Sequence, residues 1–178
     1  GSRDMEWDSP WGVGFPGWHA ECSAMAKKYL GIPFDIHTGG VDHIGVHHEN
    51  EIAQTEAAEG KLEANFWMHN EFLMVDSQKM SKAQQNIFTL QDLIDRGFDP
   101  MVFRYFVLGA HYRTLLNFTF EGLDGAKNSL ERLRQLGRSF ESGEAAAVVY
   151  EEKFKEALRN DLNTPSALAV MWEMVQDK

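Results

Sequence analysis

The order of structural signals between residues 18 and 60 constrains the fold more than any other feature of this sequence. From Trp18 to Leu30 apolar residues recur at helical spacing, and FDIHTGG, residues 34–40, is typical of a strand that runs into a glycine turn. Residues 47–60 are rich in helix formers and end at a glycine, which predicts a second helix. Helix, strand, glycine turn and helix in this order are typical of an open parallel α/β sheet, whose ligands bind beyond the carboxyl ends of its strands.

Helical signals dominate the second half of the chain. Residues 66–75 are expected to form one or two strands, and the polar loop DSQKMSKAQQN follows them. Thr89 and Asp92 stand in capping-box spacing, and Pro100 stands where a helix would begin. Further helices are expected at three later positions: over residues 120–140, over residues 145–160, and from Thr164 as the capping residue onward.

Composition and charge exclude several classes of protein. A single cysteine, Cys22, excludes an internal disulfide and fits a reducing compartment. The net charge of −10 argues against a general nucleic-acid binder, because affinity for phosphates comes mainly from clustered lysine and arginine. No apolar run among the 178 residues reaches membrane-spanning length, so we expect a cytoplasmic protein that does not associate with membranes.

Cys22, His47 and Glu51 form the most informative candidate site. His47 and Glu51 are four residues apart on a predicted helix, so their side chains project from one face. A thiolate from the preceding helix would complete a set of sulfur, imidazole and carboxylate, which suits Zn²⁺ better than Mg²⁺ or Ca²⁺. A buried cysteine beside a solvated histidine and glutamate is the commoner arrangement, so spacing alone leaves both interpretations open.

Three ordered blocks of sequence carry a resemblance to a known family. GWHAECSAM at 17–25, FDIHTGGVDHIGVHHENEIAQ at 34–54 and KMSKA at 79–83 closely resemble cysteinyl-tRNA synthetases. The resemblance is strong over about residues 7 to 118 and continues more weakly through NDLNTPSALAVMWEM. Three separated blocks in the right order are far more specific than any one motif.

The resemblance implies a fold class and a division into domains. Residues 3–70 would form the second half of the Rossmann-like (HUP) catalytic domain of class I synthetases, an α/β domain with a parallel sheet. Residues 71–118 would form the stem-contact segment that carries the KMSKS-like loop. Residues 119–178 would form the start of an α-helical bundle on the tRNA side.

The resemblance also implies a reaction and a cofactor. Enzymes of this family use ATP with Mg²⁺ to convert cysteine to cysteinyl-adenylate and then transfer the cysteine to tRNA(Cys). We expect the protein to be a monomer. Cys22, His47 and Glu51 fall where the family places three of the four ligands of one Zn²⁺ ion, and the fourth ligand is an upstream cysteine that this sequence does not contain. A soft metal binds a thiolate far better than a hydroxyl, which would distinguish cysteine from serine.

The KMSKA loop resembles the KMSKS signature of class I synthetases. The resemblance implies catalytic roles for Lys79 and Lys82, with Lys82 at the ATP phosphates, where an ammonium group would stabilise the charge that develops. Ala83 replaces the last serine of the signature, which puts closure of the loop in question. Without the resemblance, two lysines in a polar loop are typical of solvated side chains.

Other residues match family positions around the substrates. Gly39 and Gly40 would let the backbone approach the adenosine of ATP, and Asp42 would accept hydrogen bonds from its ribose or from the substrate ammonium. Trp18 and His37 would surround the substrate side chain. Without the resemblance, Gly39 to Asp42 would be an ordinary turn and Trp18 a core residue.

Two motifs that look catalytic are rejected. The HExxH pattern of zinc hydrolases fails because, after His48 and Glu49, the second histidine would have to stand at Ile52. HIGV, residues 43–46, looks like the class I HIGH signature, but HIGH follows the first strand of the family, well upstream of GWHAECSAM. We therefore interpret His43 as incidental and conclude that the sequence lacks its HIGH motif.

Two alternatives to a cysteine–tRNA ligase are weighed. One is a paralogue that joins cysteine to an aminosugar with the same zinc site and adenylation chemistry, and the other is a non-catalytic zinc-dependent or tRNA-associated module. HHENE and the helical region that follows favour the tRNA enzyme. Because the HIGH motif and the fourth zinc ligand are missing, we expect this chain by itself to be inactive.

Overall fold

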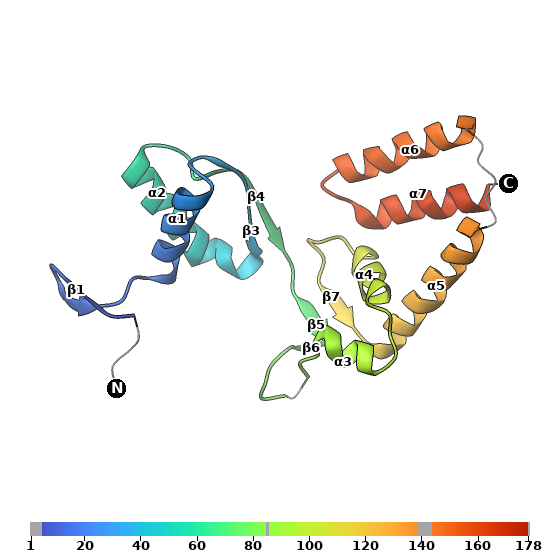
Figure 1. The fold of residues 1–178 in the computed structure, drawn as a ribbon, viewed down its shortest axis with the longest axis horizontal. Coiled ribbons are helices and arrows are strands. Elements are labelled where there is room, and N and C mark those ends of the chain that lie inside the picture. Colours follow the sequence, from blue (N-terminus) through green and yellow to red (C-terminus); the bar gives the residue numbers. More distant parts are fainter. Residues whose placement is uncertain (1–4, 85, 139–143, 178) are drawn as a thin grey trace. The chain divides into compact units, whose positions relative to one another are not determined.

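A computed structural model describes residues 5–84, 86–138 and 144–177 (Figure 1). These residues divide into two compact units, one that ends at Asn70 and one that begins at Glu71. Within the described ranges, no helix is both long enough and apolar enough to cross a membrane.

The first unit is built around two parallel strands. In chain order it contains strands β1 (Trp7–Ser9) and β2 (Gly12–Gly14), helix α1 (Trp18–Tyr29), strand β3 (Phe34–Gly40), helix α2 (Glu49–Glu59) and strand β4 (Ala64–Asn70). β1 and β2 form an antiparallel hairpin. β3 and β4 pair in parallel, and α2 lies between them in the chain, so the predicted parallel α/β arrangement is confirmed.

The connection from β3 to α2 is helical but irregular. A 3₁₀ turn, Val41–His43, is followed by a π-helical turn, Ile44–His48, that continues into α2. Such π turns occur often at functional sites, and this one carries two buried histidines, His47 and His48. The helix ends at Gly60, whose φ of 65° is the left-handed conformation that glycine adopts without strain.

The second unit combines a small sheet with five helices in the residues that the structure describes. Its elements are strands β5 (Leu73–Val75), β6 (Gln78–Lys79) and β7 (Leu116–Phe118) and helices α3 (Leu90–Asp95), α4 (Pro100–Leu108), α5 (Phe120–Arg138), α6 (Glu144–Arg159) and α7 (Thr164–Gln176). β5 lies in the middle of the sheet, antiparallel to β6 and parallel to β7. α6 and α7 form a helical hairpin (Figure 1).

An apolar cluster joins the small sheet of the second unit to helices α3, α4 and α5. Its buried members come from strands β5 and β7 and helices α3, α4 and α5: Val75, Leu93, Val102, Phe118, Leu123 and Leu130. Leu123 is 0% exposed. Burial of side chains of this size contributes about 1.5–3 kcal/mol each, so this cluster is the main reason that β5 and β7 pack against α3, α4 and α5.

Two of the predicted helix starts are confirmed. Asp92 N–H donates to Thr89 Oγ1, and Thr89 N–H donates to the Asp92 carboxylate, which is the complete capping box. Pro100 is the first residue of α4, where its missing N–H costs nothing.

The predicted cap of the last helix is wrong by one residue. Asn163 caps α7, because its Oδ1 accepts from Ser166 N–H at 3.0 Å. The hydroxyl of Thr164 donates to the carbonyl of Ala110 instead, at 3.4 Å. The hydroxyl of Thr164, which the local spacing predicted to cap α7, therefore makes a tertiary hydrogen bond.

Candidate functional site

Cys22, His47 and Glu51 converge in the first unit. Their ligand atoms all lie within 4.8 Å of one another, with Cys22 on α1, His47 in the π-helical turn and Glu51 in the first turn of α2. The i, i+4 spacing that pointed to a shared face is confirmed by a distance of 2.7 Å between His47 Nε2 and Glu51 Oε1.

The carboxylate of Glu51 is the most constrained group in this set. The residue is 0% exposed, and Oε1 accepts no hydrogen bond from the described residues, although His47 Nε2 lies 2.7 Å away. A buried anionic oxygen without a donor is costly unless a cation compensates it. Thiol, imidazole and carboxylate together are a donor set that fits Zn²⁺.

The second oxygen of Glu51 is held by His37. The Nε2–H of His37 donates to Glu51 Oε2 at 2.6 Å, and the His37 ring stacks on Trp67 with centroids 4.5 Å apart. A histidine that fixes one oxygen of a carboxylate leaves the other oriented for a ligand. The predicted place of His37 beside the substrate side chain stays a prediction, and in this structure the residue contacts a candidate metal ligand.

Negative charge and burial act together on the thiol. Burial raises the pKa of Cys22, and the neighbouring charges of Glu51, Glu21 and Glu63 raise it further. Glu63 is itself only 1% exposed, and burial followed by the charge of Glu51 raises its pKa. A cation reverses this balance, because it stabilises the thiolate and the carboxylates at once.

Histidine and tryptophan rings surround the candidate ligands. His48 Nδ1 and His69 Nε2 share a hydrogen bond of 2.8 Å, and burial followed by the neighbouring His37 and His69 lowers the pKa of His48 to about 4. His48 is therefore neutral at pH 7. Trp18 contacts the ring of His47 at a centroid distance of 4.3 Å but remains 61% exposed, so it is not the core residue that its apolar character suggested.

His43 belongs to this cluster of rings. Its ring centroid lies 5.0 Å from that of His47 and 5.2 Å from that of His48, and it also contacts Trp18. The interpretation of His43 as incidental to the HIGH signature stays a prediction, and the structure adds only that its ring packs among those around the candidate ligands. Sequence reasoning also missed Trp67 and His69 on β4. They are two residues apart in a strand, and this spacing could have placed their side chains on one face.

Gly39 and Gly40 end β3 in extended conformation, and Asp42 follows them as the exposed residue of the 3₁₀ turn. A Cβ atom at Gly39 would lie 2.5 Å from His48 Cε1, and a Cβ at Gly40 would meet Asp42 Oδ1. Both glycines thus make room for this chain's own side chains. Glycine is therefore needed at both positions for packing alone, whether or not a nucleotide approaches the same backbone.

The two lysines of the KMSKA loop lie in the other unit. Lys79 is exposed at the end of β6, with its Nζ 5.4 Å from the centre of the Phe72 ring, and Lys82 is exposed in the turn that follows. Met80, between them in the loop, packs against the apolar cluster. The loop thus presents its cations to solvent from an apolar base.

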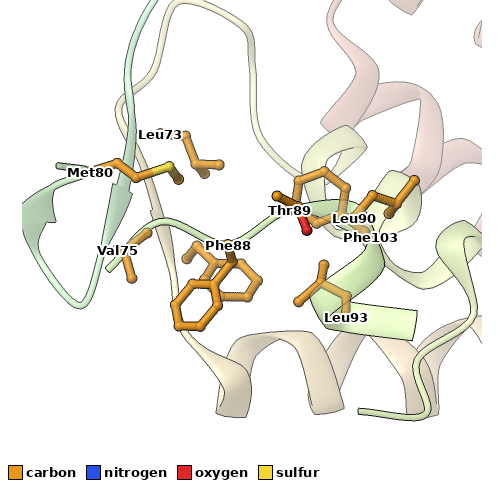
Figure 2. A pocket seen from close by; sticks show the side chains of 9 residues that line it. Leu73, Val75, Met80, Phe88, Thr89, Leu90, Leu93 and Phe103 are labelled. Carbon is orange, nitrogen blue, oxygen red and sulfur yellow. The ribbon is translucent and has the colours of Figure 1, made fainter. Parts of the chain in front are cut away.

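Met80 also lines a pocket of about 90 Å³. Apolar side chains dominate its wall, which consists of Leu73, Val75, Met80, Phe88, Thr89, Leu90, Leu93, Phe103 and Phe118. Figure 2 shows Met80 and Leu73 on the side of the sheet and Leu93 and Phe103 on the side of the helices.

The fold is that of a class I aminoacyl-tRNA synthetase. A solved structure with the same fold is the ternary complex of Agrobacterium radiobacter K84 agnB2 LeuRS with tRNA and LeuAMS, which matches with a TM-score of 0.71 over 97% of this chain and 29% of that chain. The identity is 13%, so this likeness concerns the fold alone.

The sequence defines the family within that class. Residues 1–128 match the family described as tRNA synthetases class I (C) catalytic domain, and residues 153–177 match the DALR domain. The chain therefore belongs to the class I (C) family of tRNA synthetases, as the three ordered blocks predicted.

Similar curated proteins have consistent names. The chain is 54% identical to cysteine–tRNA ligase 1 of Burkholderia lata over 98% of its own length, 50% identical to the cysteine–tRNA ligase of Opitutus terrae over 97%, and 46% identical to that of Brachyspira hyodysenteriae over 97%. It spans between 37% and 39% of the length of these relatives.

Proposed function

We propose that the protein that contains this chain is a cytoplasmic, monomeric cysteine–tRNA ligase. It would activate cysteine with ATP and Mg²⁺ to give cysteinyl-adenylate and pyrophosphate, and then transfer the cysteine to tRNA(Cys). Membership of the class I (C) family and the names of the relatives support this proposal. Because the chain spans less than two fifths of those relatives, the activity is assigned to the whole protein.

We further propose that Cys22, His47 and Glu51 hold Zn²⁺. The observation that carries this proposal is the fully buried Glu51 Oε1, which accepts no hydrogen bond from the described residues and lies within ligand distance of an imidazole and a thiol. When bound, Zn²⁺ would supply a Lewis acid that holds the substrate sulfur as a thiolate, which serine cannot match.

The other residues of the first unit would position groups around that ligand set. Trp18 and His37 would surround the substrate side chain, and His37 would also keep the Glu51 carboxylate in place through its 2.6 Å hydrogen bond. Gly39, Gly40 and Asp42 stand at the carboxyl end of β3, where ligands of parallel α/β sheets bind, and would face the nucleoside of ATP.

The lysines of the KMSKA loop would act on the phosphates. In the first step a carboxylate oxygen of cysteine attacks the α-phosphorus, and the bond to the departing pyrophosphate breaks. The ammonium groups of Lys82 and Lys79 would stabilise the charge that gathers on that leaving group. In the second step a ribose hydroxyl of tRNA attacks the activated carbonyl, and AMP leaves.

The reaction is tested by ATP–pyrophosphate exchange in the full-length protein. We expect exchange that depends on cysteine and is reduced by about a hundredfold or more with serine, because a hydroxyl is a far poorer ligand for a soft metal. Residues 1–178 by themselves should give no exchange. Equal exchange with serine would remove the thiol-recognition proposal, and charging of an aminosugar in place of tRNA(Cys) would assign the chain to the ligase paralogue.

The zinc site is tested in this chain by competition with a fluorescent zinc chelator. Glu51→Gln should weaken zinc binding by about tenfold or more, because an amide oxygen is a poor substitute for a ligating carboxylate. Glu56→Gln, an exposed change on the same helix, is the matched control and should leave the affinity unchanged. Equal affinities in the two variants would exclude Glu51 as a ligand.

A further inference from the structure

Asn86 bridges the backbone on both sides of Met80. Its Nδ2 donates to the carbonyl of Lys79 at 3.2 Å, and its Oδ1 accepts from the N–H of Ser81 at 2.8 Å. These bonds span seven and five residues, so the contact is a bridge across the loop and not a local turn of the asparagine. A side chain needs both a donor and an acceptor to make it, and asparagine carries both on one terminal carbon.

The bridge holds the backbone at the base of the loop. Met80, between the two bonded residues, packs against the apolar cluster and lines the pocket of about 90 Å³ (Figure 2). Beyond the bridge, Ser81 Oγ accepts from the N–H of Gln84 at 3.2 Å, which closes a turn around Lys82. Lys82 is thus carried on a short turn whose starting point is set by Asn86.

We propose that Asn86 is a positioning residue that sets Lys82 against the phosphates of ATP by holding the loop backbone at Lys79 and Ser81. This inference rests on the proposed function, because it assigns Asn86 a role in the same activation step. The apolar pocket complements the bridge, since the flexible thioether of Met80 can shift within it while the backbone at its two ends stays bonded.

The kinetic test uses ATP–pyrophosphate exchange in the full-length protein. Asn86→Ala should raise KM for ATP or lower kcat by about tenfold, while KM for cysteine stays within about twofold and the melting temperature is unchanged. Asn86→Asp keeps the acceptor for Ser81 N–H but sets a second acceptor against the Lys79 carbonyl, so it should impair the ATP parameters as well. Gln84→Ala, an exposed amide in the same loop, should behave like the wild type.

A second measurement separates this inference from the proposed function. Hydrogen exchange of the Ser81 amide in this chain should be about tenfold faster in Asn86→Ala, because its hydrogen-bond acceptor is lost. An unchanged Ser81 amide, unchanged ATP parameters, or an equal rise in both KM values would each overturn the inference. Faster exchange in a protein without cysteine-dependent activity would instead overturn the proposed function and leave Asn86 as the residue that holds the loop.

Discussion

At the scale of single residues, the candidate metal site depends on how tightly its surroundings are packed. Glu51 is fully buried with His37 on one oxygen, and the ring of His48 fills the space above Gly39. In a closely packed interior, the addition of even one methyl group lowers the stability of the fold. A side chain at Gly39 would therefore displace the ring of His48 beside the candidate ligands.

Gly39→Ala tests this packing. The new Cβ would lie 2.5 Å from His48 Cε1, so we expect a loss of about 1–3 kcal/mol in the free energy of unfolding. Gly45→Ala is the matched control, because a Cβ at Gly45 meets nothing within 4 Å and should cost nothing. Chemical denaturation of both variants measures the difference, and equal stabilities would mean that the histidine rings move aside without cost.

At the scale of elements, a polar cluster ties the residues after α4 to the turn between α6 and α7. Arg113 Nε donates to Asp161 Oδ2 at 2.7 Å, and the hydroxyl of Tyr112 donates to Asp161 Oδ1. The backbone of Asp161 is left-handed, with φ at 54°, a conformation that aspartate adopts more readily than most other non-glycine residues. Asp161 therefore links two elements that lie far apart in the sequence.

The pH dependence of Asp161→Asn tests this link. The hydroxyl of Tyr112, followed by Arg113, lowers the pKa of Asp161 below its usual 3.8. A depressed pKa means that the contribution to stability is present above that value and is lost as the pH falls through the lower, folded-state pKa. The difference in melting temperature between wild type and Asp161→Asn should thus be largest near pH 7 and shrink below about pH 3.8. A difference that is independent of pH would contradict the ionic role of this carboxylate.

At the scale of the whole molecule, the two units carry separate parts of the proposed chemistry. The candidate zinc ligands lie in the unit that ends at Asn70, and the KMSKA loop lies in the unit that begins at Glu71. Anything that binds only the folded state stabilises the part that binds it, by about 2.7 kcal/mol at a hundredfold excess over Kd. Zinc binding should therefore change the stability of the first unit, and a mutation in the apolar cluster should change that of the second.

Peptide-resolved hydrogen exchange tests that separation. Saturating zinc should slow exchange in α1 and α2, with little change in α4 and α5. Leu123→Ala should speed exchange in α4 and α5, with little change in α1 and α2. The substitution removes a fully buried side chain from the apolar cluster of the second unit, at a cost of about 2–5 kcal/mol. Zinc protection confined to the second unit would be incompatible with the proposed ligands.

The sequence by itself determined the features that depend on near neighbours in the chain. The capping box of Thr89 and Asp92, the start of α4 at Pro100 and the shared face of His47 and Glu51 all follow from spacings of three or four residues or from the missing N–H of proline. The first helix of the first unit follows from hydrophobic period, the strand from its run into a glycine turn, and the second helix from its helix formers and the glycine that ends it.

Only the tertiary structure decided the contacts that join distant segments. The hydrogen bond of His37 to Glu51, the place of His43 among the rings and the transfer of the α7 cap from Thr164 to Asn163 each depend on which segment lies opposite. The bridge from Asn86 depends in the same way on how its loop folds back. Spacing fixes the direction of a side chain relative to its own element, and packing alone fixes what that side chain meets.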